Sequence, residues 1–295
     1  MSDGAHHPTS RRLPLLEASM PDPSRPTSTH AVRRIDPKGL QGDWINTESS
    51  PRRLARILIE GRSDAIAVRP LGVEDTAPEG MGWFDSRALY ASSTGGDAVA
   101  FIAERDVDSM PVALQANLSK GLLIVSSFQT RLLSGGPERL FAREFFRRSD
   151  PEFPGPSDVS PTESVVRPLS SSSAASTFGG FWRNTNMTGS GIASVSFAPT
   201  DDGGTMCVRG RDRSDANDWG TTTVEFYNEI GALVEPAKIK ARYDLGSMEV
   251  QLHGWVKQGV LVLALFRRFR DALGESSYFD REFFYRTDRH TNGDW

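Results

Sequence analysis

The sequence predicts an all-β protein made of two tandem eight-stranded antiparallel up-and-down barrels, joined by a Ser/Pro-rich linker. Three observations support this fold class. The 295-residue chain repeats itself at a fixed offset, each repeat divides into eight short strand-like segments, and turn residues separate these segments. Eight short antiparallel strands with tight connections usually close into a barrel, because closure removes the exposed edges of a sheet.

The repeat is anchored by the motif Gly-x-Trp-x-Asn-Thr. It stands at 42–47 and again at 180–185, which is an offset of 138 residues (180 − 42). The same offset aligns FAREFFRR at 141–148 with FDREFFYR at 279–286. Further matches at this offset pair Asp106 with Asp244, Ser109 with Ser247, Met110 with Met248, Leu114 with Leu252, Gly121 with Gly259, Leu123 with Leu261 and Phe128 with Phe266. One offset at both ends of the repeat indicates a duplicated domain.

The duplication sets the expected domain boundaries. Each copy spans about 110 residues, enough for one hydrophobic core, so we expect barrels at 38–148 and 178–288. Residues 149–177 are rich in Ser and Pro and predict an extended linker. Residues 1–37 have few large apolar side chains and predict a disordered tail, and 289–295 form a short C-terminal tail.

The strand predictions follow from β-branched and aromatic residues and from turn signals. In the first copy we expect strands at 42–47, 53–61, 65–72, 87–93, 98–106, 112–119, 121–131 and 139–148. In the second copy we expect them at 180–185, 191–199, 205–211, 222–229, 237–245, 248–256, 259–270 and 277–286. Apolar and polar residues alternate at 238–245, which is typical of a strand with one face in water.

The seventh strand of each copy departs from this alternation. GVLVLALF at 259–266 is apolar on both faces, and GLLIVSSF at 121–128 is nearly so. A barrel strand of this kind needs a cover on its outer side, because large apolar patches are rarely left in water. We therefore expect the two barrels to pack against each other, or a homodimer to form, through this region.

Composition argues against several classes of protein. A net charge of −4 gives no general attraction for nucleic acid or anionic lipid. The apolar run at 259–266 is far shorter than the roughly 20 residues of a membrane helix, and no secretory signal is expected. The single cysteine, Cys207, cannot form an intrachain disulfide, which favours a cytoplasmic location. We expect Cys207 to be buried on its strand, and the excess of Arg over Lys is typical of a GC-rich bacterial genome.

Catalytic side chains are few. Among the five histidines only His253 lies within a predicted barrel, and the alternation of its strand predicts a surface position. No His/Cys spacing predicts a zinc site and no Gly-rich loop predicts a phosphate site, so we expect no metal and no cofactor. The candidates for acid–base chemistry are Tyr243, His253 and Glu282.

The pairs Arg143-Glu144 and Arg281-Glu282 recur in the last strand of each copy. Neighbours on a strand face opposite sides, so one member of each pair is expected to point inward. A buried charge must be paired. We expect an inward Arg that closes the barrel floor under the motif Trp, and an Arg that binds a ligand carboxylate or phosphate is the functional alternative.

Aromatic residues are the better candidates for ligand contacts, because they combine large apolar area with hydrogen-bonding tips. Core packing without a ligand is the alternative role for the same residues. The residues expected to line a ligand site are Trp83, Tyr90, Trp219, Tyr227, Tyr243 and Trp255.

A Gly-x-Trp motif that opens the first strand of an eight-stranded barrel resembles the lipocalin and avidin-like proteins, the calycins. This resemblance implies that the motif Trp packs across the barrel floor against an Arg near the last strand. It assigns this structural role to Trp44 with Arg148 or Arg143, and to Trp182 with Arg286 or Arg281.

The second copy also resembles a bacterial domain with the pattern W-x-N-T, D-W-G and Y-D-x-G, which implies a fold rather than an activity. The first copy departs from this pattern. GWFD at 82–85 stands in place of D-W-G, and RDVDSM at 105–110 stands in place of YDLGSM at 243–248. These departures affect a shared ligand site and leave the barrel frame intact.

Eight strands leave an interior that side chains fill or that holds one small ligand. We therefore expect binding of a small apolar or amphipathic molecule in a barrel cavity or at the seam between the barrels. The alternative is a cofactor-independent cyclase or isomerase of bacterial specialised metabolism. The resemblance to barrel cyclases implies it, since shape and proximity would supply the catalysis. A second alternative is a protein-interaction scaffold that uses the outer faces of the barrels.

Overall fold

The computed structural model describes residues 35–51, 53–63, 65–73, 81–92, 96–107, 110–134, 136–149, 177–186, 191–200, 203–210, 218–230, 238–270 and 277–287. Most of the expected N-terminal tail, all but the end residues of the expected linker, and the expected C-terminal tail lie outside the described residues.

The described residues form sixteen strands close to their predicted positions, which confirms the all-β class. The first half contains β1 (Gly42–Asn46), β2 (Leu54–Arg62), β3 (Ala65–Gly72), β4 (Phe84–Ala91), β5 (Ala98–Val107), β6 (Met110–Ser119), β7 (Leu122–Leu133) and β8 (Gly136–Arg148). The second half contains β9 (Gly180–Asn184), β10 (Ile192–Thr200), β11 (Gly203–Gly210), β12 (Asp218–Glu229), β13 (Lys238–Asp244), β14 (Met248–Lys257), β15 (Val260–Phe269) and β16 (Tyr278–Thr287). A short 3-10 helix, η1 (Pro37–Gly39), precedes β1.

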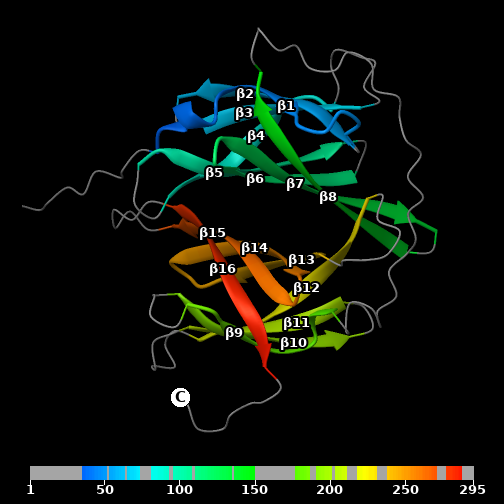
Figure 1. The fold of residues 1–295 in the computed structure, drawn as a ribbon, viewed down its shortest axis with the longest axis vertical. Helices are drawn as coiled ribbons and strands as arrows, with labels where there is room; N and C mark the ends of the chain where they lie inside the picture. The colour runs from blue at the N-terminus through cyan, green and yellow to red at the C-terminus, as the bar shows by residue number, and fades with distance from the viewer. Residues whose placement is uncertain are drawn as a thin grey trace, which may run out of the picture.

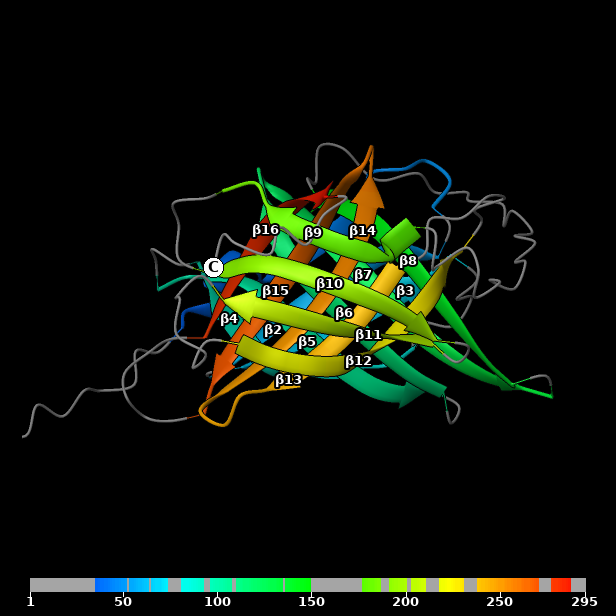
Figure 2. The same ribbon diagram turned by 90° about the horizontal axis from the view of Figure 1, so that it is seen from below.

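Consecutive strands pair antiparallel within each half, and the halves lie one above the other in Figure 1. The strand β1 pairs again with β8, and β9 pairs again with β16, so the last strand of each half returns to the first. Two short parallel pairings, β8 with β12 and β4 with β16, join the halves into one 16-stranded sheet. In Figure 2, β9 to β12 lie in front and cross over β14 and β15.

The turn between the sixth and seventh strands has the same geometry in both halves. Lys120 and Gly121 have φ angles of 51° and 80°, and Gln258 and Gly259 have φ angles of 51° and 79°. A two-residue hairpin turn with positive φ at both positions matches the twist of the flanking strands. The second position is glycine in both turns, because glycine adopts positive φ without steric cost.

Each half encloses its own hydrophobic core. The inward face of the seventh strand contributes to both cores, with Leu123 and Val125 in the first half and Leu261 and Leu263 in the second. All four side chains are at most 1% exposed. The seventh strand thus places every second residue in the core of its half, although its other face is apolar as well.

The outer faces of the halves pack against each other along a contact that we call the seam, between β4–β8 and β12–β16. Tyr90 packs edge-to-face on Phe266, with ring centroids 5.2 Å apart, and Tyr227 packs on Phe128 at 5.0 Å. The buried apolar residues of the seam are Tyr90, Ala100, Ile102, Ala113, Phe128, Phe141, Tyr227, Trp255, Val262, Ala264 and Phe266. The apolar outer side of β15 is thus covered by the first half, which is one of the two arrangements expected from its sequence.

Candidate functional site

Each motif tryptophan is buried beneath an arginine of the last strand. Trp44 and Trp182 are both 1% exposed, and each indole N–H donates to the backbone carbonyl four residues earlier. The guanidinium carbon of Arg148 lies 4.5 Å from the Trp44 ring centroid, and that of Arg286 lies 5.6 Å from the Trp182 ring centroid. Of the alternatives left by the sequence, the structure places Arg148 and Arg286 over these rings.

The inward member of each Arg-Glu pair is the glutamate. Glu144 accepts hydrogen bonds from the backbone N–H of Leu54 at 3.1 Å and from Nδ2 of Asn46 at 3.3 Å. Glu282 accepts from Nδ2 of Asn184 at 2.5 Å in the equivalent place. The motif Asn and the last-strand Glu therefore bridge the first, second and eighth strands of each half.

The expectation that Arg143 or Arg281 points inward is wrong. Both point outward into the seam, where Arg143 lies over the Trp255 ring at 4.3 Å and Arg281 donates to Oδ1 of Asn117 at 2.6 Å. The glutamate points inward because the backbone N–H groups at this place donate to its carboxylate. A guanidinium only donates hydrogen bonds, so these N–H groups could not pair with it.

A charged cluster, defined as Arg267, Asp280 and Glu282, lies at one end of the second-half interior. The side chain of Arg267 is only 4% exposed and forms ion pairs with Asp280 and, at 3.1 Å, with Glu282. Its guanidinium carbon lies 5.8 Å from the Trp219 ring and 5.2 Å from the Tyr278 ring. Arg267 follows the core leucines of β15 at the same period of two, so it faces inward with them.

The cluster holds two carboxylates against one guanidinium. Burial raises the pKa of Asp280 and of Glu282, and Arg267 opposes the rise in both. Burial is the largest influence and lowers the pKa of Arg267, but the charge and hydrogen bond of Asp280, together with Tyr278 and Glu282, outweigh it and raise that pKa. Arg267 is therefore a permanent cation, and the two carboxyl groups take up protons more readily than free ones.

The predicted residues Trp219 and Tyr243 lie beside this cluster. Their rings are 5.4 Å apart, and the Tyr243 hydroxyl donates to the backbone carbonyl of Met206 at 2.7 Å. Burial raises the pKa of Tyr243, so its hydroxyl stays neutral. Trp83 is instead partly exposed in the first half, with Arg69 5.8 Å from its ring.

The other predicted aromatic residues, Tyr90, Tyr227 and Trp255, lie in the seam. They therefore line the interior of neither half, although all three are at most 7% exposed. Tyr227 donates its hydroxyl hydrogen to Glu225 at 2.9 Å. Burial raises the pKa of Tyr90 and of Tyr227.

The prediction of a surface position for His253 is wrong. The residue is 4% exposed, because the first half covers the outer side of β14. Its Nδ1 lies 2.6 Å from Oε1 of Gln115, and its Nε2 lies 3.4 Å from Oγ of Ser126. An amide oxygen only accepts, so Nδ1 carries the proton. Burial holds the pKa of His253 well below its usual range, and nearby cations lower it further.

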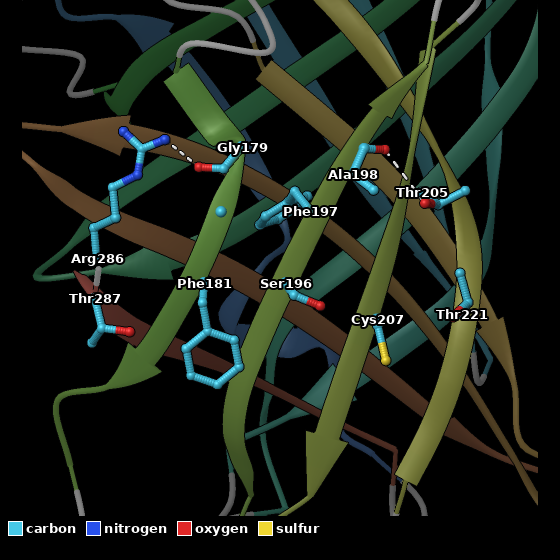
Figure 3. A pocket seen from close by; sticks show the side chains of 11 residues that line it. Gly179, Phe181, Ser196, Phe197, Ala198, Thr205, Cys207, Thr221, Arg286 and Thr287 are labelled. Carbon is cyan, nitrogen blue, oxygen red and sulfur yellow. Dashed lines mark hydrogen bonds between the residues drawn. The ribbon is translucent and has the colours of Figure 1, made fainter. Parts of the chain in front are cut away.

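A groove of about 680 Å³ lies on the outer side of β9 to β12 (Figure 3). Its lining includes Phe181, Ser196, Thr205, Cys207, Thr221 and Arg286. Arg286 donates a hydrogen bond to the carbonyl of Gly179 there. Cys207 is a free, partly exposed thiol, so the expectation that it is buried is wrong. None of the predicted ligand-contact residues is among the residues that line this groove.

Sequence reasoning missed Arg267 and Asp280. The available signal was the period of two in β15 and β16, which places Arg267 in phase with Leu265 and Asp280 in phase with Phe284. The apolar run before Arg267 obscured this signal, because its two faces look alike. The recurring Arg-Glu pair singles out Glu282 in the sequence.

No family model, curated protein or solved structure matches this chain. The likeness to calycins therefore rests on its motifs. Within the described residues, no helix is long or apolar enough to cross a membrane. The same part of the chain contains no group of three or more His, Cys, Asp or Glu side chains that could hold a metal ion.

Proposed function

We propose that the chain is a duplicated pair of eight-stranded lipocalin-like barrels, at 38–148 and 178–288, and that the second copy binds a small amphipathic molecule. The pairing of β1 with β8 and of β9 with β16 supports the barrel part of this proposal. The Trp–Arg contact in each half supports the likeness to lipocalins.

The binding proposal rests on the missing hydrogen-bond partner of the Oδ1 atom of Asp280. This oxygen is buried and accepts no hydrogen bond from the described residues. Leaving a buried acceptor without a donor costs about 1–3 kcal/mol, and a ligand that donates to it removes this cost. Because the charged cluster has one more carboxylate than guanidinium, a hydroxyl or an amine suits this position better than an acidic group.

The body of the ligand is expected to be apolar. The charged cluster adjoins a core that contains Tyr243, Val250 and Leu265, with Trp219 and Met248 packed partly buried against it. Ligand sites commonly combine such apolar walls with a few placed polar groups. Trp219 stands near the start of β12 and is only partly buried, so its displacement would admit a ligand to this end of the half.

Catalysis of a cyclisation or isomerisation is the second candidate function. The raised pKa of Asp280 and of Glu282 favours it, because a carboxyl group that holds its proton at higher pH can deliver it as a general acid. Conversion of a bound precursor by the purified protein, abolished in Glu282→Gln and Asp280→Asn, would identify this function.

Native mass spectrometry of the protein from its own host, followed by denaturing extraction, tests the binding proposal. We expect a stoichiometric small molecule with the wild type and its loss with Asp280→Ala, which copies Ala142 at the equivalent first-half position. Asp85→Ala is the matched control, because Asp85 is an exposed carboxylate of β4. Bare wild-type protein, or a molecule that Asp280→Ala retains fully, would contradict the proposal.

A further inference from the structure

The seam relates equivalent residues of the two halves to each other. Gln115 and His253 differ by 138 residues, the offset of the repeat, and they hydrogen-bond directly across the seam. Such a contact between equivalent positions is what a two-fold axis produces in a symmetric interface. Arg143 and Arg281 are a second equivalent pair, placed beside Ser126 and Ala264 in the two registers.

Positive charge accumulates around this contact. Four cations, Arg143, Arg281, Lys238 and Lys240, act electrostatically on His253. In the part of the chain that the structure describes, Lys238 is balanced by Glu229 at 3.3 Å. Arg143 forms no ion pair with a described carboxylate. Its pKa falls to about 10, chiefly through burial and then through repulsion by Arg281.

Hydrogen-bond donors at the seam are left without acceptors. The Nε atoms of Arg143 and Arg281 and the Nε2 atom of Gln115 are buried, and none has a hydrogen-bond partner among the described residues. Gln115 itself is only 1% exposed. Buried donors are nearly always satisfied in native proteins, so an acceptor is missing at this place. Arg143 and Arg281 are partly exposed, which leaves a route from solvent.

We propose that the seam binds a phosphate group through Arg143, Arg281 and Gln115. Two guanidinium forks on equivalent positions offer paired N–H donors to a tetrahedral oxyanion. A dianion compensates two arginine charges at once and accepts from the amide N–H of Gln115. Trp255 lies under Arg143, where a cation–π contact holds the guanidinium in place. The site uses no residue of the charged cluster, so it is independent of the proposed ligand site.

Calorimetric titration of the full chain tests this proposal with two probes, inorganic phosphate and phenyl phosphate, at constant ionic strength. We expect saturable binding of one equivalent and a rise in the thermal unfolding midpoint with each probe. Tighter binding of phenyl phosphate would assign the site to organic phosphates, and equal affinity would assign it to free phosphate.

The double variant Arg143→Gln/Arg281→Gln should weaken phosphate binding by about tenfold or more, because both charge-assisted contacts are lost. Arg62→Gln is the control, since Arg62 is exposed in an ion pair on β2. Gln115→Met, which keeps the seam filled, should weaken binding less. No binding by the wild type, or equal binding by the wild type and the double variant, would overturn the proposal.

Discussion

The two halves share their frame and differ in charge at one end of their interiors. Gln129 and Ala142 of the first half occupy the positions of Arg267 and Asp280 in the second, at the same offset of 138 residues. Gln129 is 7% exposed, and among the described residues its side chain donates only a weak contact to a methionine sulfur at 3.8 Å. The contacts common to both halves hold the shared frame, and the charged cluster found only in the second half is the place where we propose ligand binding.

The largest effect is expected from the motif tryptophans. Trp44→Ala and Trp182→Ala each remove a fully buried indole, which should cost about 3–5 kcal/mol of unfolding free energy. Similar losses are expected because the two sites have the same contacts. Urea unfolding of both variants measures the loss of unfolding free energy. A loss below about 1 kcal/mol for one of them would show that the two tryptophans do not have equivalent roles.

The motif asparagines allow a second comparison of stability between the two halves. Asn46→Ala and Asn184→Ala should each cost about 1–3 kcal/mol, because buried acceptors lose their donor. We expect the greater loss for Asn46, since Glu144 then keeps only backbone donors, whereas Glu282 also keeps Arg267. Chemical denaturation at pH 7 compares the two, and a greater loss for Asn184 would contradict this reasoning.

The seam should make stability depend on pH through His253. Folding lowers the pKa of this side chain, so the unfolded chain binds the proton first. Its contribution is fully present above about pH 6.5 and is lost as pH falls below that value, by up to about 1.4 kcal/mol per pH unit. Glu144 acts in the opposite sense, because burial raises its pKa to about 6 and its contribution is lost as pH rises through that value.

His253→Gln isolates the first effect, because it copies Gln115 and removes the titrating group. Urea midpoints of the variant and the wild type, measured from pH 7.5 to pH 5, should diverge as the pH falls. The wild type should lose more stability than the variant. Parallel curves would show that His253 titrates alike in the folded and unfolded chain.

The smallest effect is expected in the repeated hairpin turns. Gly121→Ala and Gly259→Ala each force a side chain into positive φ, at a cost of about 1 kcal/mol. Nothing lies within 4 Å of a Cβ at either position, so the cost is conformational and should be equal in both halves. Thermal unfolding checks this, and unequal shifts would show that one turn contacts its surroundings.

The sixteen strands could be predicted from the sequence because alternation and turn residues are local signals. The burial of His253 could not be predicted, because its strand alternates normally. Its polar face is buried only because the first half packs against it. The same holds for Tyr90 and Trp255, whose roles depend on the seam. The orientation of Arg143 and Glu144 could not be predicted either. The strand period of two places them on opposite faces, but it does not determine which of them faces the core.

A high-resolution crystal structure of the protein purified from its own host tests the proposed ligand site most directly. We expect a bound molecule in the second half, with a donor within hydrogen-bond distance of Oδ1 of Asp280 and its apolar body near Trp219. We expect no equivalent molecule beside Gln129 in the first half. Electron density for such a molecule in the first half alone, or an Asp280 satisfied by the protein itself, would contradict the claim that the charged cluster is a ligand site.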